Sequence, residues 1–123
     1  MTTPAEVVRK SFKAYETKDR AAIEAVIADV FHFTSPLDNG IDRKTYFDRC
    51  WPNSEPLERF DIVRMITSED QVFVTYEAHT KDGRRFRNSE VFTVRGLKIV
   101  EVEVYFGWSI PHEAPPGAFK KAT

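Results

Sequence analysis

The chain has 123 residues, of which 41% are hydrophobic and 30% charged, and its formal net charge is −1. This length suits a single domain with one core and leaves no room for a second. The near balance of acids and bases excludes nucleic acid as the main partner, because neutralising phosphates requires a basic surface.

The cysteine count and the apolar runs indicate the cellular compartment. Cys50 is the single cysteine, which excludes an internal disulfide and a thiolate metal site. The opening residues MTTPAEVV lack the basic and apolar regions of a secretory signal, and no apolar run approaches the roughly twenty residues that span a bilayer. We therefore expect a cytoplasmic protein with no membrane partner.

Two helices are predicted at the start of the chain. Thr3 supplies an N-cap hydroxyl, Pro4 occupies the first helical position, and Glu6 lies three residues after the cap. After a break, Asp19 is placed to cap a second helix. The apolar stripe expected on this second helix is Ile23, Val26, Ile27 and Val30.

A short strand, a loop and a third helix follow. Residues 31–35 alternate, with Phe31, Phe33 and Ser35 on one side, and Pro36 ends the strand. After a loop over 36–40, Asp42 is placed to cap a helix that Pro52 ends. Its large side chains are Tyr46, Phe47, Cys50 and Trp51. Residues 57–67 then alternate as a long strand.

Residues 72–108 predict an antiparallel meander of three strands, VFVTYEAHT, RFRNSEVFTV and IVEVEVYFGW. Asp82-Gly83 is typical of a two-residue type I′ turn, which would pair Lys81 with Arg84. This register predicts one shared face for Phe73, Glu77, His79, Phe86, Asn88, Glu90 and Phe92.

The second turn of the meander tests which strand face is buried. A two-residue loop would place Glu90 opposite Glu101, and like charges destabilise a sheet, so we favour a three-residue loop that pairs Val94 with Lys98. Apolar side chains then join the Glu90 face: Val100, Val102, Val104, Phe106 and Trp108. An apolar face with a few polar groups is typical of a ligand pocket.

The element order indicates an α+β domain in which three N-terminal helices pack on one face of a strongly curved antiparallel or mixed sheet, giving a cone. The other sheet face is expected to be half apolar, with Val72, Val74, Tyr76, Val91, Ile99 and Tyr105 among Arg85, Arg87, Glu101 and Glu103. Such a face is suited to a copy of itself, so we predict a homodimer through the sheet.

Several strings in the chain resemble the nuclear transport factor 2-like superfamily, which includes SnoaL-like polyketide cyclases and ketosteroid isomerases. They are ETKDRAAIEAVIAD, the strand ending FTSP with a glycine a few residues later, the helix IDRKTYFDRCW and the strand KIVEVEVYFG. Their order and spacing, over nearly the whole chain, carry the resemblance. It implies a single cone-shaped domain over 1–123 with an irregular tail from 109, a deep pocket and a dimer through the open sheet face.

Ketosteroid isomerases allow a comparison residue by residue. The resemblance places Ser35 at the position of their catalytic aspartate base and Ser11 at that of the oxyanion-hole tyrosine. Glu90 falls at the position of their protonated oxyanion-hole acid. Because serine cannot shuttle a proton between carbons near neutral pH unaided, ketosteroid isomerase activity is not expected.

The predicted pocket contains a small polar set between aromatic walls. His79 with Glu90 or Glu77 is a candidate acid–base pair, because burial raises the pKa of a carboxyl group and an imidazole can exchange the proton. The predicted substrate-binding residues are Phe12, Tyr15, Phe33, Ser35, Tyr46, Trp51, Asn88, Phe106 and Trp108. The expected reaction is isomerisation, cyclisation or dehydration of a small hydrophobic carbonyl or ring compound, with no metal or cofactor.

Other interpretations of the same residues stay open. Glu77 and His79 could pair with Arg87 or with water at a sheet edge, or bind a divalent ion together with Glu90. Asp38, in the loop after Ser35, could supply the missing base. The whole cone could instead be a non-catalytic module that binds a hydrophobic ligand, or a dimeric interaction domain.

Overall fold

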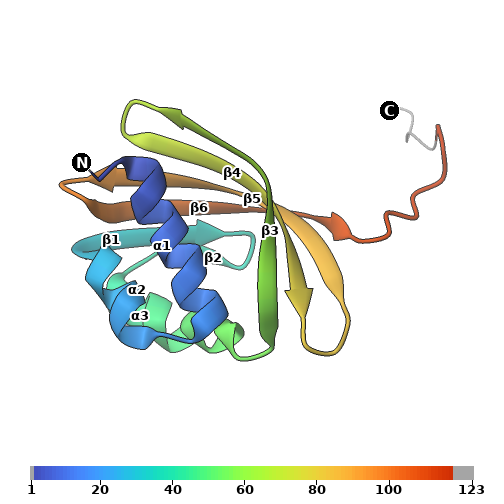
Figure 1. Cartoon of the computed structure of the whole chain (residues 1–123), viewed down its shortest axis with the longest axis horizontal. Helices are drawn as coiled ribbons and strands as arrows, with labels where there is room; N and C mark the ends of the chain where they lie inside the picture. Colours follow the sequence, from blue (N-terminus) through green and yellow to red (C-terminus); the bar gives the residue numbers. More distant parts are fainter. Residues whose placement is uncertain (1, 118–123) are drawn as a thin grey trace.

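The computed structural model describes residues 2–117 and has three α-helices, a short 3₁₀-helix and six strands (Figure 1). In chain order these are α1 (Pro4–Thr17), α2 (Arg20–Val26), β1 (Ile27–Ser35), β2 (Asp38–Ile41), α3 (Arg43–Arg49), η1 (Trp51–Ser54), β3 (Leu57–Ser68), β4 (Gln71–Thr80), β5 (Arg85–Arg95) and β6 (Lys98–Ser109).

All three predicted helix starts are confirmed. Thr3 Oγ1 accepts a hydrogen bond from the Glu6 amide, and Asp19 and Asp42 accept from the amides three residues later. Each cap satisfies one of the backbone donors that the first helical turn leaves free. The sequence therefore predicts where α1, α2 and α3 begin.

The second helix is shorter than predicted, and the first strand is longer. Ile27 has an extended backbone and begins β1, so Ile27 and Val30 belong to a strand and not to a helical stripe. Val30 is 77% exposed. Phe31 and Phe33 are buried on one side of β1, as predicted. The loop predicted over 36–40 is shorter, because Asp38 begins β2.

The six strands form one mixed sheet in the order β2-β1-β6-β5-β4-β3. β1 and β6 are parallel, and all other neighbouring pairs are antiparallel. Register shifts in β1, β3, β5 and β6 bend the sheet around the helices, since an extra residue increases local twist. Figure 1 shows α1 lying across the inside of the curve. The predicted α+β cone is confirmed, and the sheet stays open.

The β4–β5 hairpin differs from the predicted one by a single residue. The Thr80 amide donates to the Arg84 carbonyl at 2.9 Å and Gly83 has φ +90°, so the loop holds three residues. Glu77 is consequently opposite Arg87, and His79 is opposite Arg85. A slip of one residue exchanges the two faces of a strand. The faces predicted for β4 were therefore wrong.

The structure puts alternate residues of β4 in the core, where Val72, Val74, Tyr76 and Ala78 are buried. These residues pair with inward-facing positions of β5: Val74 with Glu90 and Tyr76 with Asn88. The predicted wall residue Phe73 lies on the outer face and is 41% exposed. The strand thus supplies Tyr76 to the concave side and sends Glu77 and His79 to the convex side.

The β5–β6 turn also differs from the prediction, but most of the residues predicted on the inner face of β6 lie on that face. Arg95 pairs with Lys98 around a two-residue loop, and a bulge leaves Val100 between Ile99 and Glu101 without a partner. The bulge restores the phase, so Val102, Val104 and Phe106 lie opposite Phe92, Glu90 and Asn88, on the predicted face. Ile99 is buried in the core, and the faces predicted for Ile99 and Val100 were wrong.

The end of the chain departs slightly from the predicted tail over 109–123. Ser109 still belongs to β6, and residues 110–117 contain no helix or strand. Residues 118–123 lie outside the described part of the chain. Within residues 2–117, the helices are all too short or too polar to cross a membrane.

Candidate functional site

A cavity of about 550 Å³ lies between the helices and the concave face of the sheet. Its size is within the range of small-molecule sites. Predicted ligand-contact residues that line it are Phe12, Tyr15, Phe33, Ser35, Tyr46, Asn88, Phe106 and Trp108. Trp51 is not among the lining residues; its ring packs edge-on against Tyr15, with centroids 4.9 Å apart. Trp51 therefore supports the wall from behind.

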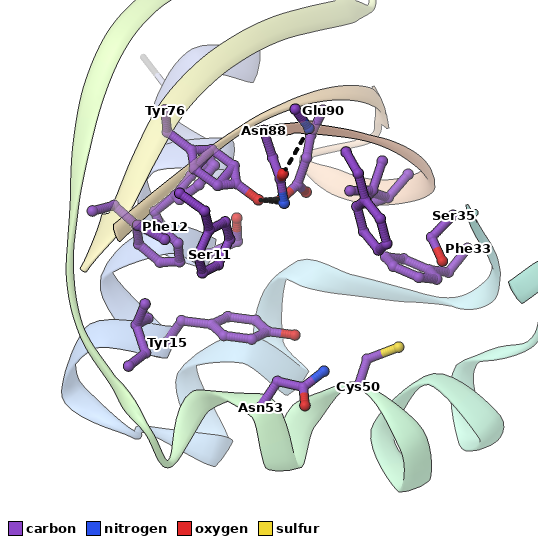
Figure 2. A pocket seen from close by; sticks show the side chains of 18 of the residues that line it. Ser11, Phe12, Tyr15, Phe33, Ser35, Cys50, Asn53, Tyr76, Asn88 and Glu90 are labelled. Carbon is purple, nitrogen blue, oxygen red and sulfur yellow. Dashed lines mark hydrogen bonds between the residues drawn. The ribbon is translucent and has the colours of Figure 1, made fainter. Parts of the chain in front are cut away.

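Glu90 is the acidic group that strands β4, β5 and β6 bring to this cavity. It is half-buried on β5, opposite Val104 of β6 and Val74 of β4. Tyr76 Oη donates a hydrogen bond to Glu90 Oε2 at 2.5 Å, and Asn88 Nδ2 lies 3.5 Å from Tyr76 Oη. Figure 2 shows the three side chains gathered on one wall. Adjacent strands thus build a carboxyl–phenol–amide group.

A bulge in the β5–β6 ladder fixes the Asn88 amide. The Gly107 amide donates to Asn88 Oδ1 at 3.1 Å, which leaves the Asn88 NH₂ directed towards Tyr76. A Cβ atom at position 107 would lie 2.1 Å from the Arg87 carbonyl oxygen, so only glycine allows this approach of the strands. Gly107 is therefore part of the scaffold that orients the polar group.

Burial controls protonation on this wall. Desolvation raises the pKa of Glu90 from 4.5 to about 7, against the hydrogen bond from Tyr76, which lowers it. The pKa of Tyr76 is raised by burial and by the charge of Glu90, so its hydroxyl keeps its proton. Glu90 can therefore gain or lose a proton near neutral pH while Tyr76 stays a donor.

The helix side of the cavity carries a second polar pair. Tyr15 Oη of α1 and Tyr46 Oη of α3 lie 2.5 Å apart. Burial raises the pKa of both phenols, and repulsion by Glu90 adds to the shift. Burial likewise raises the pKa of the nearby Cys50 thiol to about 11, which keeps it protonated and a poor nucleophile near neutral pH.

Ser11 and Ser35 line the same cavity, but both hydroxyls are engaged. Ser11 Oγ donates to the Val8 carbonyl at 2.7 Å. Ser35 Oγ accepts from the Leu37 amide and lies 3.4 Å from Asp38 Oδ2. Asp38, the candidate replacement base, also lines the cavity and forms an ion pair with Arg49 at 2.7 Å. The carboxylate of Asp38 is therefore already engaged by a cation.

His79 and Glu77 lie on the outer face of the sheet, so the predicted contact of either with Glu90 was wrong. His79 Nε2 is 2.7 Å from Asp61 Oδ2 on β3, and Arg87 Nη2 is 2.7 Å from Glu77 Oε1. The predicted alternative of a Glu77–Arg87 pair is thus present. Ligand atoms of Asp61, Glu77 and His79 lie within 4.8 Å of one another, but Arg87 already neutralises Glu77.

Sequence reasoning missed Tyr76 as a site residue because it assigned this tyrosine to the outer face. A usable signal was present in β4. The alternate residues Val72, Val74, Tyr76 and Ala78 are more apolar than Phe73, Thr75, Glu77 and His79, and the more apolar set of a half-buried strand faces the core.

The chain shares its fold and a family with known proteins. The family model of the SnoaL-like domain matches residues 8–102. An NTF2-like protein of unknown function from Cytophaga hutchinsonii is 18% identical, with a TM-score of 0.72 over 87% of this chain and 92% of that one. The comparison with curated proteins gives no match.

Two further solved structures carry names of enzymes. A Kribbella flavida protein provisionally named a ketosteroid isomerase is 15% identical, with a TM-score of 0.75 over 98% of this chain and 90% of that one. An LEH-like epoxide hydrolase from M. tuberculosis is 16% identical, with a TM-score of 0.69 over 85% of this chain and 82% of that one. At these identities the likeness shows the fold alone.

Proposed function

The chain belongs to the SnoaL-like domain family, and from this premise we propose that its cavity binds a small hydrophobic carbonyl or ring compound on which Glu90 performs acid–base catalysis. The reaction class is isomerisation, cyclisation or dehydration, and it needs no cofactor. Glu90 replaces His79 and Glu77 as the proposed catalytic group, because only Glu90 of the three faces the cavity.

The pKa of Glu90 near 7 carries this proposal. A general acid or base works best when its pKa lies close to the working pH, since both protonation states are then available. The apolar walls that raise this pKa also suit a hydrophobic substrate, so one feature of the cavity supports both the binding and the chemistry.

The simplest step of this kind is removal of a proton from the carbon next to a carbonyl group. The C–H bond breaks, the proton passes to a carboxylate oxygen of Glu90, and the electron pair moves to the carbonyl oxygen to give an enolate. Return of the proton to a different carbon completes an isomerisation. Tyr76 holds the carboxylate in place during both transfers, and Asn88 in turn contacts the Tyr76 hydroxyl.

Two fold neighbours carry the names of enzymes. Proteins named an epoxide hydrolase and, provisionally, a ketosteroid isomerase share this cone, so the fold accommodates enzymes. The alternative is a module that binds a hydrophobic ligand without turnover, for which the cavity alone would suffice.

Hydrogen–deuterium exchange of 2-tetralone in D₂O, followed by ¹H NMR, tests the proposal with a ketone that enolises readily. We expect wild-type protein to accelerate exchange next to the carbonyl group and Glu90→Gln to lose at least about a hundredfold of that acceleration. Glu101→Gln, an exposed change on β6, is the control and should keep the wild-type rate. Binding of 2-tetralone without Glu90-dependent exchange would favour the non-catalytic module. The absence of both binding and exchange would overturn the proposal.

A further inference from the structure

We propose that Tyr15, supported by Tyr46, is a second ligand-binding site in the cavity and donates a hydrogen bond to a neutral oxygen of the substrate. This inference rests on the proposed function and narrows its substrate class. The substrate would carry an ether, carbonyl or hydroxyl oxygen near the helices, in addition to the carbonyl group next to the carbon from which Glu90 removes a proton.

The two tyrosines are held rigidly by their neighbours. The Tyr46 ring contacts Phe31, Phe33 and Phe47 with centroid distances of 5.1 to 5.2 Å. The Tyr15 ring packs edge-on against Trp51 at 4.9 Å. Because these rings fix both side chains, the hydroxyl groups meet at 2.5 Å without depending on a ligand.

The tyrosine pair has one hydroxyl proton that its internal hydrogen bond does not use. Two phenol groups hold two O–H protons, and the contact between them uses one. Among residues 2–117, neither hydroxyl has a hydrogen-bond acceptor other than its partner. The second proton of the pair has no protein acceptor and faces the cavity, so an oxygen atom supplied by a ligand can accept it.

Tyr15 is the member of the pair that a ligand can reach. Tyr46 is only 6% exposed, whereas Tyr15 is less buried and its hydroxyl points into the cavity (Figure 2). If Tyr46 donates to Tyr15, the free proton is the one on Tyr15. A hydroxyl that accepts one hydrogen bond is also a stronger donor of its own. Tyr46 is thus a positioning residue, and Tyr15 makes the contact.

Charge in the cavity favours a neutral oxygen over a carboxylate. Glu90 faces the same space and its charge acts on both phenols. The one cationic side chain among the described lining residues is Arg84, which is exposed and paired with Asp82 at 2.9 Å. An anionic ligand group near Tyr15 would meet repulsion from Glu90 without a compensating cation.

Matched probes separate this contact from general packing. The probes are 2-tetralones with a methoxy group at each of the four aromatic ring positions, each paired with its ethyl analogue, which has a similar size and no acceptor. Dissociation constants are measured by calorimetry for wild-type, Tyr15→Phe, Tyr46→Phe and the control Tyr105→Phe, whose hydroxyl lies on the outer face next to Glu103. Thermal unfolding confirms that each variant is folded.

At one ring position or more, we expect wild-type protein to bind the methoxy compound about tenfold more tightly than its ethyl analogue. Tyr15→Phe should remove this preference and change the affinity for plain 2-tetralone less than about twofold. Tyr46→Phe should keep part of the preference, because Tyr15 retains its proton. Tyr105→Phe should keep all of it.

The inference is overturned if no methoxy position gives a preference, or if the preference survives in Tyr15→Phe. The Glu90-dependent exchange of plain 2-tetralone does not need the second oxygen. If the exchange rate is normal and no methoxy compound is preferred, only this inference is refuted. If the protein neither binds 2-tetralone nor accelerates its exchange, the proposed function is refuted as well.

Discussion

Tyr76 Oη lies 2.5 Å from Glu90 Oε2, and the two side chains come from adjacent strands of one hairpin. This contact opposes the effect of burial, because a donated hydrogen bond stabilises the ionised carboxyl group. Burial has the larger effect, and the pKa of Glu90 ends near 7. Both the reactivity of the site and the pH dependence of folding follow from this balance.

Replacing Tyr76 with Phe removes the hydrogen bond that lowers the pKa of Glu90. We expect the Glu90 pKa to rise by roughly one further unit, since a hydrogen bond to a charged group is worth about 1.5 to 3 kcal/mol. A ¹³C NMR titration of the glutamate carboxyl groups measures this directly. Tyr105→Phe, on the outer face, should leave the Glu90 signal unchanged. A fall in the Glu90 pKa of Tyr76→Phe would contradict the assigned contact.

Glu90 should make the folded protein less stable as the pH rises. Its pKa is about 7 when folded and near 4.5 when unfolded, so the folded state binds more protons between these values. Stability contributed by protonated Glu90 is present below pH 4.5 and is lost progressively up to pH 7. The loss is about 3 kcal/mol at most.

Glu90→Gln lacks this titration, so its free energy of unfolding relative to wild type should increase between pH 4.5 and pH 8 by up to about 3 kcal/mol. Urea denaturation at several pH values measures the difference. Glu69→Gln, an exposed change in the β3–β4 turn, is the control and should track wild type. A Glu90→Gln difference that stays constant across this range would show that folding does not raise the pKa of Glu90.

Local signals in the sequence predict most of the fold. Caps at Thr3, Asp19 and Asp42 are local, and they mark the helix starts correctly. The end of α2 is missed because Ile27 continues an apolar pattern that suits a helix or a strand, and contact with β6 decides between them. Boundaries that depend on tertiary pairing are therefore the ones that local patterns miss.

In the site, too, local patterns predict some residues correctly, and strand pairing decides the others. Glu90 and Asn88 are correctly predicted to share one face with Val102, Val104 and Phe106. The partner Tyr76 is missed because Asp-Gly also fits a three-residue loop with Gly83 in the left-handed region, and one extra loop residue reverses β4. The bulge at Val100 happens to correct a second error in turn length.

Removal of His79 should leave the chemistry intact. His79 contacts Asp61 on the outer face and has no path to the cavity except through the sheet. We expect His79→Ala to keep the 2-tetralone exchange rate within about twofold of wild type and to lower stability, since the ring is 9% exposed. Exchange and urea denaturation on the same sample measure both. A tenfold loss of the exchange rate in a stably folded His79→Ala protein would show that His79 contributes to catalysis.

The outer face of the sheet is suited to a second copy of the chain. Phe73 is 41% exposed and Tyr105 54% exposed. Arg85 lies towards one end of β5, where Arg87 is already paired with Glu77, whereas Glu101 and Glu103 of β6 lie opposite Thr93 and Val91, nearer the other end. A copy related by a two-fold axis would place the basic end of one face against the acidic end of the other, as an isologous interface requires.

We therefore expect a homodimer by light scattering at about 50 µM and a monomer for Phe73→Glu, because the new charge would be buried in the contact, in the same cross-strand row as Glu103. Leu97→Glu is the matched control, since Leu97 is 55% exposed in the β5–β6 turn, away from the face centre. High salt should weaken the wild-type dimer by screening the paired ends. A wild-type monomer at this concentration would refute the predicted dimer, and a dimer that survives Phe73→Glu would assign the contact to another surface.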